Sequence, residues 1–266
     1  MPRTAVNGLK LYYEIEGDGE PLVLIPGFAA GRWIWFKQIG DLAREFRVIT
    51  FDPRGVSASD KPQGPQTISL LADDVAHLLQ AVGIESAHIV GASFGGFVAQ
   101  EFALKYPSMT RKLVLCCTSF GGPNHVAPAP ETLLALASTK GLNSEERMRA
   151  NLLLAFSPEY VRTRVAEVDE VVQLRAANDV PEYIYLSQWQ AAMNFNAECR
   201  LDQIKCPTLV LSGDADVIVP VQNSRNLAAK IRGAQLGISA GGSHTFFIEQ
   251  PDEFNSAVRQ FLSRGN

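Results

Sequence analysis

The chain has 266 residues, of which 46% are hydrophobic and 20% are charged, a composition typical of a globular protein with a substantial buried core. Its formal net charge is −4 and its isoelectric point is near 5.6, so it lacks the basic excess that nucleic acids and anionic membranes attract. We therefore expect neither of these partners.

Residues 1–8 contain no apolar signal core, and no stretch reaches the roughly 18 uninterrupted apolar residues of a membrane span. These features predict a cytoplasmic protein. The cysteines are Cys116, Cys117, Cys199 and Cys206, and they lack Cys-x-x-Cys spacing. We expect buried free thiols, with the two adjacent cysteines on opposite faces of a strand.

The first part of the chain alternates predicted strands and helices. An Asn-Gly turn at residues 7–8 predicts a hairpin between residues 3–6 and 9–16. Apolar runs predict further strands at residues 21–25, 47–51, 87–90 and 111–117. Helices are expected at residues 33–46, 68–82 and 94–106.

The pattern changes between residues 120 and 200, where strand signals are absent. Helices are predicted there at residues 131–137, 144–156, 158–174 and 181–195. A crossover between parallel strands needs only one helix, so roughly eighty helical residues indicate an inserted cap. Beyond it, the chain resumes with strands at residues 208–213 and 234–238 and helices at 221–231 and 251–264.

This order of elements predicts an α/β fold with a mostly parallel, doubly wound sheet. Residues 1–119 and 201–266 are expected to form the core, and residues 120–200 the helical cap. In such sheets ligands bind beyond the carboxyl ends of the strands, so reactive side chains are expected there.

The strongest local signal is the Gly-x-Ser-x-Gly pattern around Ser93, which stands between a predicted strand and a predicted helix. Such a tight turn strains the serine backbone, and Gly91 and Gly95 avoid collisions where strand and helix meet. The pattern also arises by chance in turns, but the flanking elements favour a nucleophile at a helix N-terminus, where an oxyanion is stabilised. Phe97 replaces the lysine of a phosphate-binding loop and excludes that alternative.

A serine nucleophile needs a base, and the chain has four histidines. His77 lies within a predicted helix, and His88 is about 16 Å from Ser93 along an extended strand, too far to act on it. His125 stands at the start of the cap, where it could contact substrate or simply be exposed. His244 follows the last strand at a carboxyl end, so we predict that it is the base.

The orienting carboxylate is expected in residues 212–220, after the preceding strand. Asp214 follows a glycine and is expected to bond within its own turn, so we assign the role to Asp216. The resulting chain order of Ser93, Asp216 and His244 is the order typical of this architecture.

Together these motifs resemble the α/β-hydrolase superfamily, and the resemblance covers essentially the whole chain. Residues 51–55 and 59–62 are similar to its Asp-x-Arg-Gly-x-Gly-x-Ser segment, residues 213–220 to its acid loop, and residues 244–251 to its histidine segment. The resemblance implies hydrolysis through an acyl-serine, a cap that shapes the pocket, and neither a cofactor nor a metal. The length and single cap most resemble the enol-lactonase and small carboxylesterase branch.

Two positions depart from the family pattern. Pro26 replaces the histidine that usually precedes the oxyanion-loop glycine, so this loop must be anchored in another way. Ser57 stands where a second glycine is common, which leaves the conformation of its loop open.

The substrate contacts are predicted more coarsely. We expect the backbone N–H groups of Phe28, in the small-residue loop 26–31, and of Phe94 to form the oxyanion hole. A mostly apolar pocket is expected, although simple packing of the cap explains the same residues. Its predicted lining is Trp33, Phe120, Phe156, Trp189 and Met193.

The predicted function is cleavage of a small-molecule carboxylic ester or lactone. A serine nucleophile argues against haloalkane dehalogenases and epoxide hydrolases, whose elbow carries aspartate. Carbon–carbon bond (diketone) hydrolases keep the same triad and need cap residues for a substrate carboxylate, for which Arg162, Arg164 and Arg175 are candidates. Cofactor-free haloperoxidases and ligand receptors built on the hydrolase fold are further alternatives, and the complete triad speaks against a receptor.

Overall fold

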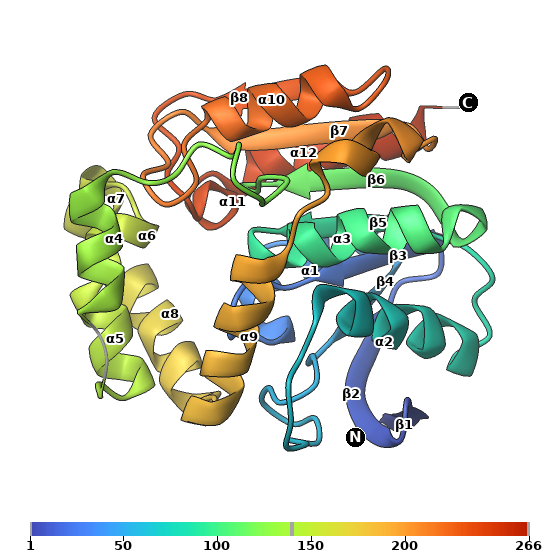
Figure 1. Cartoon of the computed structure of the whole chain (residues 1–266), viewed down its shortest axis with the longest axis horizontal. Helices are drawn as coiled ribbons and strands as arrows, with labels where there is room; N and C mark the ends of the chain where they lie inside the picture. The colour runs from blue at the N-terminus through green and yellow to red at the C-terminus, as the bar shows by residue number, and fades with distance from the viewer. Residues whose placement is uncertain (1, 139–140, 265–266) are drawn as a thin grey trace.

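The computed structural model describes residues 2–138 and 141–264, and within them eight strands form one sheet in the order β1-β2-β4-β3-β5-β6-β7-β8 (Figure 1). Strand β2 is antiparallel to both of its neighbours, β1 and β4, and β3 to β8 all run parallel to one another. This confirms the mostly parallel α/β sheet. The strands are β1 (Arg3–Val6), β2 (Leu9–Glu16), β3 (Glu20–Ile25), β4 (Phe46–Phe51), β5 (Ala87–Ala92), β6 (Thr110–Cys116), β7 (Thr208–Gly213) and β8 (Gln235–Ser239).

Helices cover both faces of the sheet, and a group of them lies beside it (Figure 1). The helices of the two faces are α1 (Ile39–Leu42), α2 (Ile68–Ala81), α3 (Phe94–Lys105), α10 (Gln222–Lys230), α11 (Phe246–Glu249) and α12 (Pro251–Ser263). Short 3-10 turns are η1 (Arg32–Trp35), η2 (Pro107–Met109) and η3 (Glu198–Gln203).

Two apolar clusters fill the space between the sheet and the helices, one on each face of the sheet. Helices α2, α3 and α10 pack on one face, where Phe102 is fully buried, and α1, α11 and α12 pack on the other, where Phe254 is fully buried. Every residue of β5 and β7 is buried, as expected for central strands covered on both sides. The sheet is therefore a rigid platform for the loops at its carboxyl edge.

The helical insertion, residues 120–200, connects β6 to β7 and lies to one side of the sheet (Figure 1). Its helices are α4 (Pro130–Ala137), α5 (Ser144–Ala150), α6 (Leu152–Ala155), α7 (Pro158–Thr163), α8 (Val165–Ala177) and α9 (Glu182–Asn194). The two longer helices predicted at 144–156 and 158–174 are each split, at Asn151 and Arg164. Among the described residues, none of the helices combines the length and apolar character that a membrane span requires.

The expected helix at residues 33–46 is wrong. A 3-10 turn and the four-residue α1 occupy this segment, and Phe46 already belongs to β4. The aromatic and β-branched residues 33–36 and the glycine at 40 have weak helix preference, and packing of Trp35 in the core decides the local structure.

The adjacent cysteines also differ from expectation. Strand β6 ends at Cys116, and Cys117 has a φ of 49°, so its side chain does not follow the alternation of the strand. The two Sγ atoms lie 3.3 Å apart instead of on opposite faces. Both thiols are buried, but Cys199 is exposed and Cys206 only half-buried, so the expectation of buried thiols fails for Cys199.

Candidate active site

Ser93 occupies the sharp turn between β5 and α3. Its φ of 54° and ψ of −119° lie outside the usual regions for a residue with a side chain, so the expected strain is present. A Cβ added at Gly91 would lie 2.3 Å from the carbonyl oxygen of Gly95, and one added at Gly95 would lie 2.4 Å from that of Ile25. The close approach of strand and helix therefore requires both glycines.

Hydrogen bonds on both sides hold this strained residue. The Ser93 N–H donates to the carbonyl oxygen of Cys116 at 2.8 Å. The Ser93 carbonyl accepts from Thr118 Oγ1 and from the Gly96 N–H, both at 2.8 Å. The hydroxyl is thus presented from a fixed backbone.

Three loops at the carboxyl ends of β5, β7 and β8 bring Ser93, Asp216 and His244 together. His244 Nε2 lies 3.0 Å from Ser93 Oγ, and His244 Nδ1 lies 2.8 Å from Asp216 Oδ2. Because a carboxylate only accepts, Nδ1 donates to Asp216, which leaves Nε2 to accept the serine proton. The structure therefore links the three predicted residues in one hydrogen-bonded chain.

The Asp216 carboxylate is fully buried and firmly oriented. Its Oδ1 accepts from the N–H groups of Ile218 at 2.9 Å and Val219 at 2.8 Å, while Oδ2 faces His244. Contrary to expectation, Asp214 does not bond within its own turn but accepts from the N–H of Gly241 at 2.7 Å, in the loop between β8 and α11. Of the two candidate carboxylates, only Asp216 contacts the histidine.

The other three histidines make their hydrogen bonds to groups other than Ser93. Burial is the main cause that lowers the pKa of His88, opposed by its hydrogen bond to Glu20 at 3.0 Å. The two remaining bonds are His77 Nδ1 to the Asp73 carbonyl, 2.7 Å, and His125 Nδ1 to the Gly122 carbonyl, 2.5 Å.

The backbone amides of Phe28 and Phe94 lack a protein acceptor within the described residues. The Phe28 ring meets the Phe94 ring edge-on, with centroids 5.8 Å apart. The two predicted oxyanion-hole positions thus lie side by side, and both amides are available to a ligand.

The loop that carries Phe28 is anchored from the helical insertion. Ala29 has a φ of 48°, which costs a residue with a side chain conformational energy. Its N–H donates to Gln188 Oε1 at 2.8 Å, and its carbonyl accepts from Arg175 Nη1. These two bonds anchor the oxyanion loop, in which Pro26 replaces the histidine that is usual in the family. The sequence suggested Arg175 only as a carboxylate ligand and gave no signal for Gln188.

The insertion also anchors the histidine loop. The carbonyl oxygen of Ala155, at the end of α6, accepts from Ser243 Oγ at 2.8 Å. It accepts from Thr245 as well, from N–H at 3.0 Å and from Oγ1 at 2.6 Å. The neighbours of His244 on both sides are therefore fixed to one carbonyl.

The predicted pocket residues lie in different surroundings. The Trp189 ring meets the Phe28 ring edge-on, with centroids 6.1 Å apart, and Met193 is mostly exposed. Trp33 and Phe156 are buried in the cluster beneath α12, and Phe120 in the cluster beneath α3. The burial of Trp33, Phe156 and Phe120 agrees with the alternative interpretation, in which these side chains pack in the core and do not line a pocket.

One metal-ligand arrangement occurs among the described residues. One ligand atom from each of Cys117, Asp216 and His244 lies within 4.8 Å of the other two. Burial, above all, and the contact with Cys116 raise the pKa of the Cys117 thiol well above its ordinary value. A neutral thiol is a poor ligand, and the other two groups already bond to each other.

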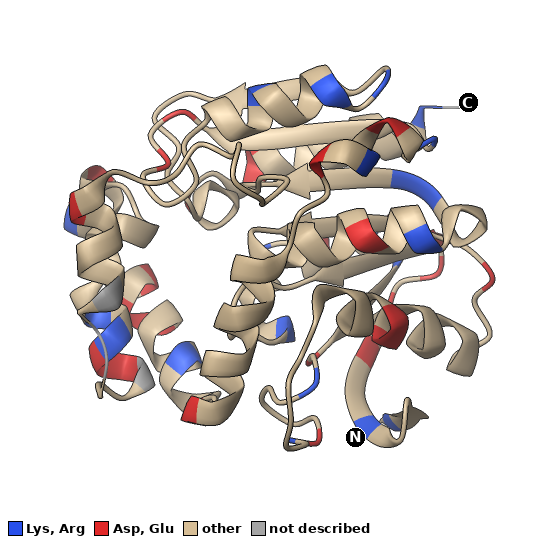
Figure 2. Ribbon diagram, in the orientation of Figure 1, with Lys and Arg blue, Asp and Glu red and all other residues tan. Residues whose placement is uncertain are grey.

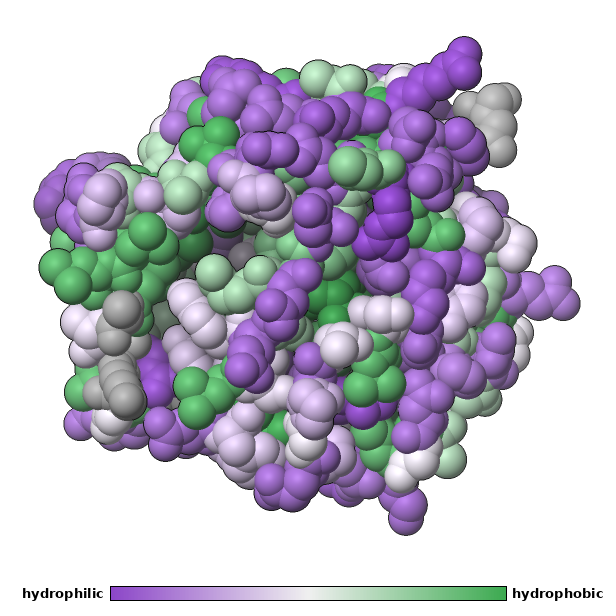
Figure 3. Space-filling model, in the orientation of Figure 1, coloured by the Kyte–Doolittle hydropathy of each residue, from purple (hydrophilic) through white to green (hydrophobic). Residues whose placement is uncertain are grey.

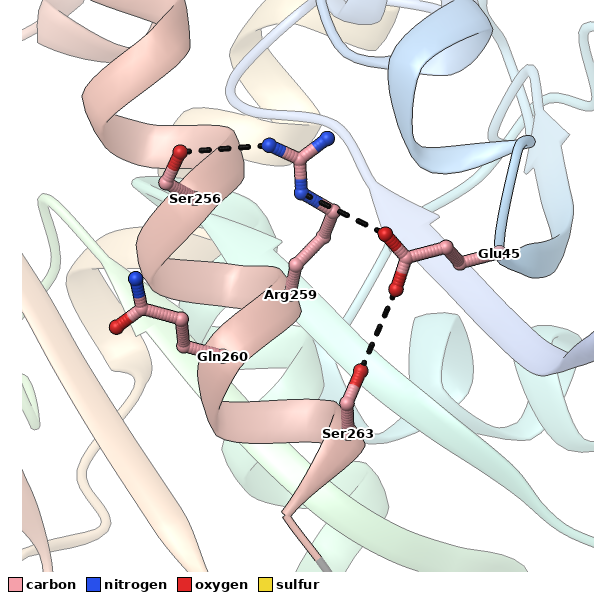
Figure 4. A pocket seen from close by; sticks show the side chains of 5 residues that line it. All are labelled: Glu45, Ser256, Arg259, Gln260 and Ser263. Carbon is pink, nitrogen blue, oxygen red and sulfur yellow. Dashed lines mark hydrogen bonds and ion pairs between the residues drawn. The ribbon is translucent and has the colours of Figure 1, made fainter.

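A surface groove of about 270 Å³ lies elsewhere, between α12 and the turn before β4 (Figure 4). Its charged groups are already paired, since Arg259 Nε lies 3.9 Å from Glu45 Oε1. The groove contains none of Ser93, Asp216 and His244, so we assign it no role in the chemistry. Its lining is Glu45, Ser256, Arg259, Gln260 and Ser263.

Residues 20–251 match the family model described as alpha/beta hydrolase fold, which spans most of the chain and includes all three residues of the hydrogen-bonded chain. The chain belongs to the alpha/beta hydrolase family. This confirms the resemblance found in its sequence motifs.

Relatives of this alpha/beta hydrolase match along nearly its full length. A protein from Caulobacter sp. (strain K31) named "Putative carbamate hydrolase RutD" is 31% identical over 99% of this chain and 98% of its own. The enol-lactonase from Burkholderia xenovorans LB400 superposes with a TM-score of 0.88 and 27% identity, covering 99% of this chain and 100% of its own. A thermophilic esterase from Thermogutta terrifontis superposes with a TM-score of 0.84 and 28% sequence identity. The match covers 98% of this chain and 96% of the esterase.

Proposed function

We propose that this hydrolase cleaves carboxylic esters or lactones through an acyl-serine intermediate. The observation that carries the proposal is the hydrogen-bonded chain from a buried carboxylate, Asp216, through His244 to the hydroxyl of Ser93. A serine hydroxyl is a weak nucleophile at neutral pH, and this arrangement supplies the base that activates it.

In the first step Ser93 Oγ attacks the substrate carbonyl carbon while His244 Nε2 takes the hydroxyl proton. Asp216 stabilises the imidazolium that forms and keeps Nε2 directed at the serine. The N–H groups of Phe28 and Phe94 donate to the oxyanion of the tetrahedral intermediate.

The intermediate then collapses. The bond to the leaving oxygen breaks, and His244 returns its proton to that oxygen, which releases an alcohol or, from a lactone, opens the ring. Water, deprotonated by the same histidine, attacks the acyl-serine, and collapse of the second intermediate releases the acid and restores Ser93.

We propose that the helical insertion, residues 120–200, acts as the cap over this site. It supplies Trp189 and Tyr185 beside the Phe28 ring, with Tyr185 at a centroid distance of 4.7 Å. These rings favour an apolar environment for part of the substrate.

The named activities of an enol-lactonase and an esterase among the similar structures support this substrate class. The RutD relative, at 31% identity, favours carbamates as a second candidate. The same serine attack on the carbonyl of a carbamate ester would expel the alcohol and leave a carbamoyl-serine. Water then cleaves it to a carbamic acid, which breaks down to carbon dioxide and an amine or ammonia, so the two candidates differ in substrate and not in machinery.

The test is the release of nitrophenol from nitrophenyl acetate and nitrophenyl butyrate by the wild type and by Ser93→Ala, with ethyl carbamate and a diketone as alternative substrates. A fluorophosphonate probe labels an activated serine whichever substrate is right. We expect the wild type to be labelled and to turn over the esters, and Ser93→Ala to do neither. Ester turnover at the wild-type rate in Ser93→Ala would refute the mechanism.

A further inference from the structure

Two arginines of the helical insertion lack a carboxylate partner within the described residues, Arg147 on α5 and Arg175 on α8. The other arginines on α5 and α7, and Arg164 between α7 and α8, form ion pairs, which makes the two exceptional. Those pairs are Arg149 with Glu145 at 3.0 Å, Arg162 with Glu159 at 2.7 Å and Arg164 with Glu167 at 3.5 Å.

Arg175 is a desolvated cation. Burial is the main cause that lowers its pKa to about 10, and the nearby charge of Arg147 adds to the effect, against the opposing influence of Tyr185 and Asp179. Its side chain is nevertheless only half-buried, so part of it remains open to a ligand. An anion bound there would offset the cost of burying the charge.

Arg147 lies next to it with unused hydrogen-bonding capacity. Its Cζ stands 4.1 Å from the centroid of the Tyr185 ring, and one terminal nitrogen donates to the Leu142 carbonyl at 2.9 Å. Its Nε is buried and has no partner. The hydroxyl of Tyr185 also lacks a protein partner within the described part of the chain.

Tyr185 and Arg175 both contact the loop that carries the proposed oxyanion donor Phe28. The Tyr185 ring meets the Phe28 ring edge-on at 4.7 Å, and Arg175 holds the carbonyl of Ala29, the next residue. Figure 2 shows basic residues on both α5 and α8, and Figure 3 shows the surface hollowed between α4 and α5 on one side and α9 on the other.

We propose that Arg147 and Arg175 bind a carboxylate carried by the acyl part of the substrate. The preferred substrates are then half-esters of short dicarboxylic acids. The inference rests on the proposed hydrolysis at Ser93 and specifies the substrate class. Guanidinium groups suit this task because they donate several parallel hydrogen bonds to the two carboxylate oxygens.

The test compares two esters of matched shape, monomethyl succinate and methyl 4-methylpentanoate, in which an isopropyl group replaces the carboxylate. Acid release is followed in a pH-stat for the wild type, Arg147→Gln and Arg149→Gln. Arg147 is the cleaner target because Arg175 also holds the oxyanion loop. Arg149 lies on the same helix but is already paired, which makes it the matched control.

We expect the wild type to prefer the half-ester by about 10- to 100-fold in kcat/KM, the range of charge-assisted hydrogen bonds. Arg147→Gln should lose most of this preference and keep its rate on the neutral ester within about threefold, and Arg147→Lys should recover part of the preference. Arg149→Gln should behave as the wild type.

Calorimetric titration of both esters into Ser93→Ala, with and without Arg147→Gln, measures binding without turnover. Tighter binding of the half-ester that Arg147→Gln abolishes supports the carboxylate site even if neither ester is hydrolysed, a result that would count against the proposed hydrolysis alone. Equal binding of the two esters, or a preference that Arg147→Gln leaves intact while the fold is unchanged by circular dichroism, would overturn the inference.

Discussion

Replacing Gln188 with leucine is expected to slow catalysis without removing any group that touches the substrate. Gln188 Oε1 accepts the Ala29 N–H at 2.8 Å, and its side chain is 1% exposed. Leucine has a similar size but no acceptor. The amide of Ala29 loses its partner, and the residue, which holds a φ of 48°, can relax and displace the adjacent Phe28 N–H.

Two known effects bracket the loss of kcat that we expect in Gln188→Leu. Leaving a buried amide without its acceptor costs about 1–3 kcal/mol. Losing an oxyanion donor altogether lowers kcat by about 100- to 1,000-fold. Since Arg175 still holds the Ala29 carbonyl, we expect partial displacement, with kcat reduced about tenfold, equivalent to about 1.4 kcal/mol, and KM changed by less than about twofold.

The assay is steady-state hydrolysis of nitrophenyl butyrate by the wild type, Gln188→Leu and Gln190→Leu. Gln190 lies exposed on the same helix and serves as the matched control. Ala29→Gly added to Gln188→Leu should restore part of kcat, because glycine adopts the positive φ without strain. An unchanged kcat in Gln188→Leu, or an equal loss in Gln190→Leu, would refute the coupling of α9 to the oxyanion loop.

Asp216→Asn should lower kcat for nitrophenyl butyrate by about 10,000-fold because the amide favours the wrong histidine tautomer, whereas Asp214→Asn should stay within about tenfold of the wild type; equal losses would contradict the assignment. Asp74→Asn should reduce the free energy of unfolding in urea by about 3–5 kcal/mol, since it leaves the buried guanidinium of Arg54, 2.5 Å from Asp74, without its charge partner. A loss below about 1 kcal/mol would argue against an intact buried pair. In the folded protein iodoacetamide should modify Cys199 first, as mass spectrometry can show, and rapid modification of the buried thiols would contradict the packing around β6.

The elements that carry the proposed catalytic residues could be predicted because their signals are local. The nucleophile turn needs glycine at positions 91 and 95 for reasons that the sequence already shows, and the carboxyl-end rule for parallel sheets places the loops of Asp216 and His244 at the same edge. No knowledge of distant contacts is needed for these inferences.

The supporting contacts could not be predicted in the same way. Gln188 and Ala29 are far apart in sequence, and a glutamine within a helix carries no sign of a buried backbone partner. The prediction of a helix at residues 33–46 fails for a related reason, because the packing of Trp35 in the core overrides the local conformational preference of the segment. The contact between Cys116 and Cys117 depends on a positive φ at Cys117, which no local residue pattern demands.

The helical insertion holds both the loop of His244 and the loop of Phe28 by hydrogen bonds, which limits how this hydrolase can change. The Ala155 carbonyl holds the histidine loop, and Gln188 and Arg175 hold Ala29. A hinge motion that lifted the insertion would release together the proposed base, His244, and the Phe28 amide, one of the two proposed oxyanion donors. A chimera with residues 120–200 taken from another hydrolase would inherit a serine whose partners are no longer fixed, so new substrate ranges are reached more readily by single substitutions in the lining than by module exchange.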